Sequence, residues 1–166
     1  MPPNPPQPPN TVIHPGGVPD CPACRRVAQV RTLEYPSFIC ELSETVVALH
    51  KHQTWEGWCV LLLKEHAEHL HELEAGRYLR VMEDVRTVAR AVVRAFAPRR
   101  MNYECLGNVL PHLHWHVIPR YPAPIDPDPG STVWVRPTHE QESGVEPSRQ
   151  AELIRRLHAA GIGQQG

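Results

Sequence analysis

Pro111-His112-Leu113-His114-Trp115-His116-Val117-Ile118-Pro119-Arg120 places a histidine at every second position and apolar residues between them. Side chains alternate along an extended strand, so the three imidazoles are expected to share one face. Next-but-one side chains lie about 6.5–7 Å apart, a span that suits a phosphate group. The pattern therefore has three interpretations: a solvated strand face, a metal site of alternate histidines, or a histidine nucleophile with flanking helpers.

Strand-like segments surround this motif and predict the fold class. Short apolar and β-branched runs are typical of strands, and the two residues Ser43-Glu44 between the first two runs indicate a hairpin. The predicted strands are Phe38–Leu42, Thr45–Leu49, Trp58–Leu63, Met101–Leu106 and His112–Pro119. About five strands with mostly short connections and one long helix predict an antiparallel α+β domain.

The long helix is predicted from about Glu74 to Ala97. Apolar residues recur there at three- and four-residue steps, which is the spacing of one helix face. The expected buried stripe is Leu79, Met82, Val85, Val88 (or Ala89), Val92 and Phe96, and the expected polar side is Arg80, Glu83, Arg86, Arg90 and Arg94. Pro98 cannot continue a helix and helps to stop this one.

Composition divides the chain into three parts. Residues 1–19 are dominated by Pro, Asn, Gln and Gly, which predicts a disordered or extended tail. Residues 20–121 hold the predicted sheet and long helix, and residues 122–166 form an extension. In that extension Val133–Val135 reads as a short strand or an anchor, and Pro147 to about Ala160 as a short C-terminal helix with Leu153 and Leu157 on one face.

Charge and cysteine content narrow the functional classes. A formal net charge of −1 predicts no strong field for a nucleic-acid polymer or an anionic membrane. No apolar run is long enough to span a bilayer and no signal-peptide pattern opens the chain, so a cytoplasmic protein is expected. Five cysteines, an odd number, argue against a disulfide framework.

Cys21-Pro-Ala-Cys24 has a spacing at which one tight turn presents two thiolates to a single tetrahedral ion. A redox pair uses the same spacing, but it usually sits at a helix start in a βαβ unit, and here a Pro/Gly-rich segment precedes it. Two unrelated free cysteines are the third interpretation. Zinc is favoured among the three.

The motif and the segments before it resemble the histidine triad (HIT) family of nucleotidyl hydrolases and transferases. His112–Ile118 has the family order His-apolar-His-apolar-His-apolar-apolar. Upstream, Val46–His50 and Gly57–His66 resemble the two central strands and the turn between them. The likeness extends from about Phe38 to Arg120, roughly half of the chain. It implies a HIT-like antiparallel sheet and the branch similar to diadenosine polyphosphate hydrolases.

The resemblance also implies the ligands of a zinc site. In some HIT branches a Cys-x-x-Cys pair is joined by a histidine just after the second central strand and by the first histidine of the triad. Those positions match His66 and His112, while His69 and His71 lie close enough in sequence to compete. With four protein ligands the zinc would be structural, because no position remains open to activate water.

By the same resemblance, the middle histidine attacks the α-phosphorus of a nucleotide, a role that carries to His114. A neutral imidazole has an ordinary pKa near 6.5 and is nucleophilic at neutral pH. His116 is then placed to donate to a phosphate oxygen or to the leaving group. The uridylyltransferase branch has glutamine at this position, so His116 favours hydrolysis over transfer between sugars.

Residues before the triad strand are candidates for the phosphate groups. The amide of Asn102 and the turn Gly107-Asn108 correspond to the family loop that holds phosphates, and ordinary turn chemistry is the alternative for Gly107 and Asn108.

Three aromatic residues are candidates for the nucleoside. His50 falls where some relatives have an asparagine on the ribose hydroxyls. Trp55 and Trp58 could stack on a base, or pack in the core or a dimer interface.

The favoured function is a hydrolase that releases NMP from dinucleoside polyphosphates or related conjugates. A zinc-stabilised nucleotide sensor and a nucleotidyl transferase are the alternatives. The resemblance further implies a homodimer paired through the long helix and an edge strand, and specificity is expected to lie in Tyr121–Trp134 and the tail.

Overall fold

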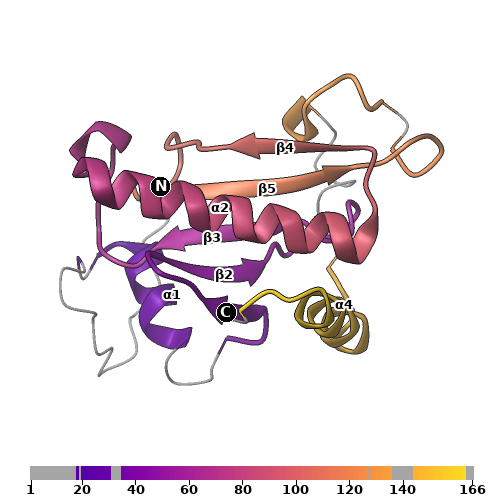
Figure 1. The fold of residues 1–166 in the computed structure, drawn as a ribbon, viewed down its shortest axis with the longest axis horizontal. Helices are drawn as coiled ribbons and strands as arrows, with labels where there is room; N and C mark the ends of the chain where they lie inside the picture. Colours follow the sequence, from indigo (N-terminus) through magenta and orange to yellow (C-terminus); the bar gives the residue numbers. More distant parts are fainter. Residues whose placement is uncertain (1–17, 19, 31–34, 127, 136–143, 164–166) are drawn as a thin grey trace, which may run out of the picture.

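One five-stranded antiparallel sheet organises the molecule, with strand order β1-β2-β3-β5-β4 (Figure 1). The computed structural model describes residues 18, 20–30, 35–126, 128–135 and 144–163. The strands are β1 (Phe38–Glu41), β2 (Thr45–Leu49), β3 (Cys59–Leu63), β4 (Arg100–Glu104) and β5 (His114–Arg120). The predicted α+β class and the β1–β2 hairpin are confirmed.

The helices are α1 (Pro22–Val30), α2 (Ala75–Phe96) and α4 (Pro147–Ala159), with short 3₁₀ turns η1 (Leu70–Glu72) and η2 (Val133–Val135). The long helix and the C-terminal helix were predicted, whereas α1 was not. The sequence interpretation of Val133–Val135 as a strand is wrong, because the segment forms η2, but the anchor alternative is confirmed, since Val133 is fully buried.

Helix α2 begins and ends where its sequence indicates. The Glu74 carboxylate accepts hydrogen bonds from the backbone N–H groups of Gly76 and Arg77 at 2.9 and 3.1 Å, which caps the first turn. At the other end Ala97 has a φ of 48°, the left-handed conformation in which helices often stop. Pro98 follows directly and cannot extend the helix.

The buried stripe of α2 differs from the predicted one at its start. Leu79 was expected in the core but is 65% exposed, and Val81 is buried in its place. At about 3.6 residues per turn, Leu79 lies roughly half a turn away from Val88, so the two residues point in opposite directions. The polar side was predicted correctly: Arg80, Glu83, Arg86, Arg90 and Arg94 are all exposed.

The sheet buries both of its faces, and each face has its own cover. On one face Leu61, Trp115 and Val117 pack against α2, and Leu153 and Leu157 of α4 join the same core. Figure 1 shows α2 lying along this face with α4 beside its C-terminal end. Burying one aliphatic side chain contributes about 1.5–3 kcal/mol. This cluster contains more buried residues than the other two clusters together, so this face supplies most of the core.

The opposite face carries the candidate site. Helix α1 packs Cys24 and Val27 against Val46 and Leu62 there, in a second cluster of buried residues. A third cluster holds Trp55, Trp58, Ile118, Tyr121 and Val133. Because side chains alternate along β5, His114 and His116 share this face with Ile118, away from α2.

The division into a tail, a domain and an extension stays a prediction. Of the predicted tail, residues 1–19, only Val18 is among the described residues. Among the described residues, no helix is long and apolar enough to cross a bilayer.

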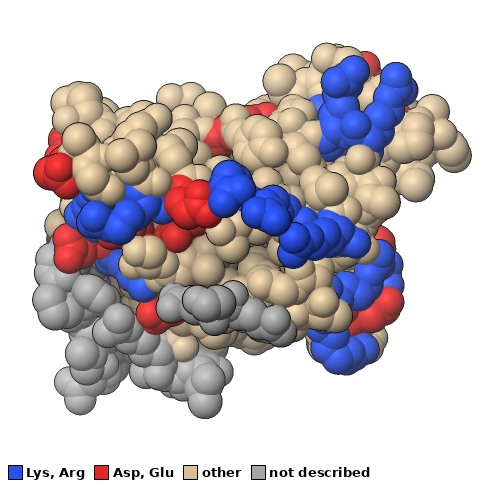
Figure 2. All heavy atoms as spheres, viewed as in Figure 1, with Lys and Arg blue, Asp and Glu red and all other residues tan. Residues whose placement is uncertain are grey.

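Figure 2 shows a line of basic side chains across the face that α2 covers.

Candidate functional site

Two of the three alternate histidines lie in the middle of the sheet. His114 and His116 are each 8% exposed, so the interpretation of a solvated histidine face is wrong. In the sheet register His114 lies opposite Leu62 and His116 opposite Val60. Their ring centroids are 5.2 Å apart, at an interplanar angle of 76°. The pair is therefore partly desolvated and held by neighbours on the central strand.

The third histidine precedes the strand, which corrects the predicted strand His112–Pro119. The backbone N–H of His112 bonds to the carbonyl of Leu110 at 2.8 Å, so the chain turns here and β5 begins at His114. The turn directs the His112 ring away from the other two imidazoles and towards α1. One motif thus supplies two separate sites.

The hydrogen bond of His114 determines which ring nitrogen is free. Its Nδ1 lies 2.7 Å from the backbone carbonyl oxygen of His112. A carbonyl only accepts, so Nδ1 carries the proton and donates. Nε2 of the neutral ring then holds a lone pair, which is the state a nucleophile requires.

His116 has the opposite arrangement. The indole Nε1–H of Trp58 donates to its Nδ1 at 3.2 Å, and an indole nitrogen can only donate. The neutral His116 ring therefore carries its proton on Nε2. Burial, with a smaller contribution from nearby His114, lowers the pKa of His116 to about 4, so the ring is a neutral hydrogen-bond donor at neutral pH.

A hollow of about 240 Å³ adjoins the histidine pair. Val60 and Leu62, the register partners of His116 and His114, line it. The other lining residues are Arg26, Tyr35, Ser37, Ala48, Leu49, His50 and Lys51. A second hollow of about 200 Å³ shares Ser37, Leu49, His50 and Lys51 and extends to Gln150 of α4. The two hollows adjoin at these four shared residues and together make up the groove beside the histidines.

His50 lies at the edge of this groove, as its predicted contact with a nucleoside requires. Its ring stacks on Trp58 at 3.8 Å and its centroid is 5.6 Å from that of His116. Burial, followed by the proximity of His116, lowers the pKa of His50 to about 3. The backbone N–H of His52 donates to Nδ1 of His50 at 3.4 Å, so the neutral ring carries its proton on Nε2 and can donate one hydrogen bond there.

The two tryptophans considered for base stacking are core residues. Trp55 and Trp58 are each 1% exposed, so stacking on a base is wrong for both and core packing is correct. Trp58 nevertheless has a functional contact, since it is the residue that orients His116.

The predicted phosphate-binding residues are spread along β4 and the loop that follows. Asn102 lies opposite Ile118, and residues directly opposite in an antiparallel pair share a face, so Asn102 is on the histidine face. Gly107 and Asn108 are exposed in the loop before β5. A Cβ at Gly107 would meet open space, so the backbone does not require glycine there. Their contact with phosphate stays a prediction.

The predicted metal ligands come together at the N-terminal end of α1. The ligand atoms of Cys21, Cys24, His66 and His112 all lie within 4.8 Å of one another. Nδ1 of His112 is 3.4 Å from Cys21 Sγ, 3.6 Å from Cys24 Sγ and 3.3 Å from His66 Nδ1. Bond lengths of about 2.0–2.1 Å to nitrogen and about 2.3 Å to sulfur at tetrahedral angles require separations of roughly 3.3–3.8 Å. The four atoms fit a tetrahedral ion such as zinc.

Contacts behind the two histidines orient them for such an ion. His112 Nε2 donates to the carbonyl of Leu63 at 2.8 Å, which leaves its Nδ1 lone pair facing the cysteines. His66 Nε2 lies 3.6 Å from the Glu68 carboxylate. The competing histidines, His69 and His71, stack on each other at the surface of η1 and lie outside the cluster.

Two residues beside His116 were not predicted to lie there, although Trp134 ends the segment Tyr121–Trp134 in which specificity was expected. The indole ring of Trp134, on η2, lies 5.1 Å from the His116 ring and 5.6 Å from Trp58. Its Nε1–H donates to the carboxylate of Glu104, which lies opposite His116 in the β4–β5 register. A lone tryptophan within a Pro- and Asp-rich segment is the signal that could have identified it.

The paired histidines lie on β5, next to the central strand β3 of the antiparallel sheet, and the Cys2His2 cluster lies where the chain enters β5. The model of the HIT domain matches residues 32–123, more than half of the 166 residues, and the chain belongs to this family.

Solved structures of this family share the fold. A histidine triad protein from Sinorhizobium meliloti 1021 is 21% identical with a TM-score of 0.67, over 78% of this chain and 93% of that one. A hypothetical histidine triad nucleotide-binding protein from Sulfolobus tokodaii is 16% identical with a TM-score of 0.62, over 84% and 98%. A zinc-bound histidine triad protein from Mycobacterium smegmatis is 20% identical with a TM-score of 0.58, over 85% and 92%.

Proposed function

We propose that this protein is a nucleotide hydrolase that cleaves dinucleoside polyphosphates or related nucleotide conjugates at the α-phosphorus and releases NMP. His114 is the nucleophile and His116 a hydrogen-bond donor to the reacting phosphate. The observation that carries this proposal is the complementary protonation of the two rings. In the neutral rings, Nε2 of His114 holds the lone pair and Nε2 of His116 holds the proton.

In the first step the Nε2 lone pair of His114 forms a bond to the α-phosphorus, and the bond from phosphorus to the leaving oxygen breaks. The positive charge that develops on the ring is stabilised by the hydrogen bond from Nδ1–H to the His112 carbonyl. His116, neutral at neutral pH, donates a hydrogen bond without transferring its proton. A phosphoanhydride suits this arrangement, because its leaving phosphate departs as an anion and needs no proton.

In the second step water attacks the same phosphorus and the phosphorus–nitrogen bond breaks. The oxygen of water stays on the NMP product, one proton of water passes to solvent, and the electron pair returns to His114 Nε2. The neutral ring is thereby restored, with Nδ1–H still on the His112 carbonyl. Dividing one substitution into two easier ones is the usual benefit of a covalent intermediate.

The groove beside the histidines supports a nucleoside as the retained group. The hollow nearest the histidines has a volume of about 240 Å³, just below the roughly 300–1,000 Å³ typical of small-molecule sites. Partly buried Val60 offers an apolar surface to a base, whereas His50 and Ser37 offer hydrogen bonds at the edge of the groove. The Sulfolobus tokodaii relative is described as nucleotide-binding, which agrees with this assignment.

Zinc is the metal that the Cys21, Cys24, His66 and His112 cluster suits best. Two sulfur and two imidazole donors at tetrahedral separations are the ligand set of structural zinc sites. Bound there, zinc would link α1 to the chain just before β5 and would supply no catalytic chemistry, because all four positions are filled by protein. The zinc-bound Mycobacterium smegmatis relative supports this part of the proposal.

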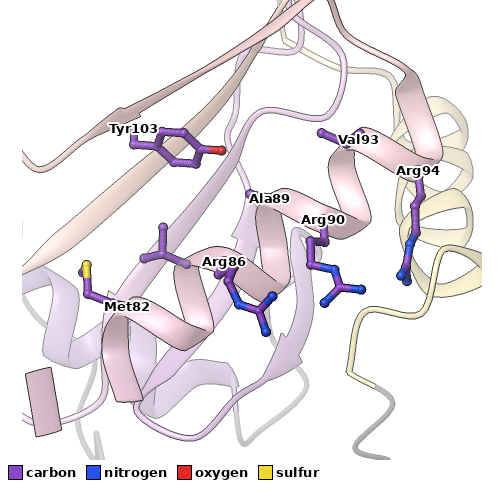
Figure 3. A pocket seen from close by; sticks show the side chains of 8 residues that line it. Met82, Arg86, Ala89, Arg90, Val93, Arg94 and Tyr103 are labelled. Carbon is purple, nitrogen blue, oxygen red and sulfur yellow. The ribbon is translucent and has the colours of Figure 1, made fainter. Parts of the chain in front are cut away.

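A homodimer is proposed from the face opposite the histidines. A groove of about 560 Å³ lies between α2 and the edge strand β4, lined by Met82, Val85, Ala89, Val93 and Tyr103 with arginines at its border (Figure 3). Val93 and Tyr103 are 46% and 55% exposed, although both are apolar or aromatic. Figure 3 shows Tyr103 on one side of the helix and the Arg86, Arg90 and Arg94 side chains extending away on the other. A second copy could cover the apolar strip and leave the arginines at the rim.

The test is hydrolysis of diadenosine triphosphate by wild type and by His114→Ala. The variant should lose about 10⁴-fold or more of kcat, because the nucleophile is gone, while nucleotide binding stays within a few-fold of wild type. His69→Ala, which changes an exposed ring outside the site, is the matched control. Turnover that persists in His114→Ala would reject the assignment. If a nucleoside diphosphate forms in place of NMP when inorganic phosphate is present, the enzyme is a transferase instead.

A further inference from the structure

Trp134 occupies a position beside His116 that the family match does not include, since that match ends at residue 123. The indole is 39% exposed, whereas Trp55 and Trp58 are each 1% exposed. It stands nearly perpendicular to both of its neighbours, at 79° to His116 and 77° to Trp58. An edge contact of this kind leaves part of the ring faces open to a further planar group.

The segment that carries Trp134 is held at several points. Next to it, Val133 is fully buried in the cluster of Trp55, Trp58 and Ile118. The Arg120 guanidinium, at the end of β5, bonds to the carboxylate of Asp126 at 2.7 Å and to two backbone carbonyls of the same segment at 2.7 and 3.1 Å. The indole Nε1–H is engaged by Glu104. The ring is therefore positioned in advance rather than ordered by a ligand.

The position of the ring relative to the groove decides what it can contact. The groove lies over β2 and β3, the histidine pair lies on β5, and Trp134 is bonded to Glu104 on β4. In the strand order β2-β3-β5-β4 the histidines thus stand between the groove and the indole. Suppose that the retained nucleoside of a substrate lies in the groove and its α-phosphorus at His114. The leaving part then lies outside the groove, and Trp134 stands on the side of the histidines that faces away from the groove.

We infer that Trp134 is a specificity-determining residue, which stacks on a planar ring in the leaving part of the substrate. This inference rests on the proposed function and deepens it: the enzyme should favour a leaving group that ends in a second nucleoside over one with the same phosphates and no ring. Stacking a base on an aromatic side chain is favourable for every base, so Trp134 selects for a ring and not for a particular base.

The experiment compares two ligands of equal phosphate number and charge, diadenosine triphosphate and the γ-methyl ester of ATP. Dissociation constants are measured by calorimetry in the His114→Ala background, where no turnover disturbs the measurement. Trp134→Ala should weaken binding of the dinucleoside compound by roughly 5- to 100-fold and leave the methyl ester unchanged. Trp134→Phe should retain most of the affinity. Val135→Ala, a change at the exposed neighbour on η2, is the matched control.

Two outcomes would overturn the inference. If Trp134→Ala weakens the binding of both ligands equally, Trp134 only supports His116. If it weakens the binding of neither ligand, the leaving part does not reach the ring. The kcat/KM values of the same Trp134 variants with wild-type His114 provide a second readout with the same expected pattern. If wild type hydrolyses neither compound, the proposed function fails, while the ratio of dissociation constants still decides the role of Trp134.

Discussion

Acidification should destabilise this fold through buried His116 and half-buried His50, which must both stay neutral. Burial lowers the pKa of His50 to about 3 and that of His116 to about 4, whereas an unfolded histidine has a pKa near 6.5. Below about pH 6.5 the unfolded chain therefore binds more protons than the folded one, and stability falls as the pH falls. For His116 this loss continues down to about pH 4, and for His50 down to about pH 3.

The magnitude for His50 follows directly. At about pH 4.5 the unfolded ring is almost fully protonated and the folded ring is not, which costs about 1.36 kcal/mol per pH unit below 6.5. Between about pH 7 and 4.5 the free energy of unfolding should thus fall by roughly 2.5 kcal/mol through this one residue. Any native pKa well below 4.5 gives nearly the same value, because the unfolded pKa sets where the loss begins.

The assay is urea denaturation of wild type and His50→Asn at both pH values. The variant should lose roughly 2.5 kcal/mol less than wild type on acidification. Taking the difference between the two proteins cancels the contributions of the metal ligands and the carboxylates, which are common to both. His71→Asn, which alters an exposed ring on η1, should behave as wild type does. An equal loss in wild type and His50→Asn would refute the reasoning that His50 is held neutral by burial.

Three further outcomes are expected. Asp126→Ala leaves the buried guanidinium of Arg120 without its ion-pair partner. The free energy of unfolding should fall by about 3–5 kcal/mol and the melting temperature by roughly 6–20 °C. A melting temperature unchanged within error would contradict the role of this pair. Purified protein should contain one zinc per chain by elemental analysis, and Cys24→Ser or a chelator should remove it and lower the melting temperature, whereas unaltered melting would exclude a structural ion. Val93→Glu should convert a dimer to a monomer in light scattering, and a wild-type monomer would reject the proposed interface.

Local patterns in the sequence were sufficient for most of the fold. Strand alternation and the helix-capping residues Glu74 and Pro98 act over a few positions, so β2 was predicted at its observed limits and α2 to within one residue at each end. Helix α1 was missed because it is short and adjoins a Pro-rich segment. Leu79 was misplaced because the predicted stripe took three successive three-residue steps, which together rotate Val88 about half a turn away from Leu79.

The candidate site was less predictable, because it depends on contacts between distant residues. The histidine motif indicated a chemical role, but the donor to His116 is Trp58, and only the fold brings the two rings together. Likewise Cys21 and His112 meet across 91 positions, a pairing that the family resemblance supplied and that spacing alone could not. Trp134 lies on a segment whose path depends on the buried Arg120–Asp126 pair, so no local pattern placed it beside His116.

The stereochemical course at phosphorus tests the role of His114 most directly. Hydrolysis of a substrate whose α-phosphorus is a chiral thiophosphate, carried out in ¹⁸O-labelled water, reports whether that phosphorus is attacked once or twice. Attack by the imidazole followed by attack by water inverts the configuration two times, so the account predicts net retention. Net inversion would mean that water attacks the substrate directly, and no bond between His114 and the nucleotide would then form.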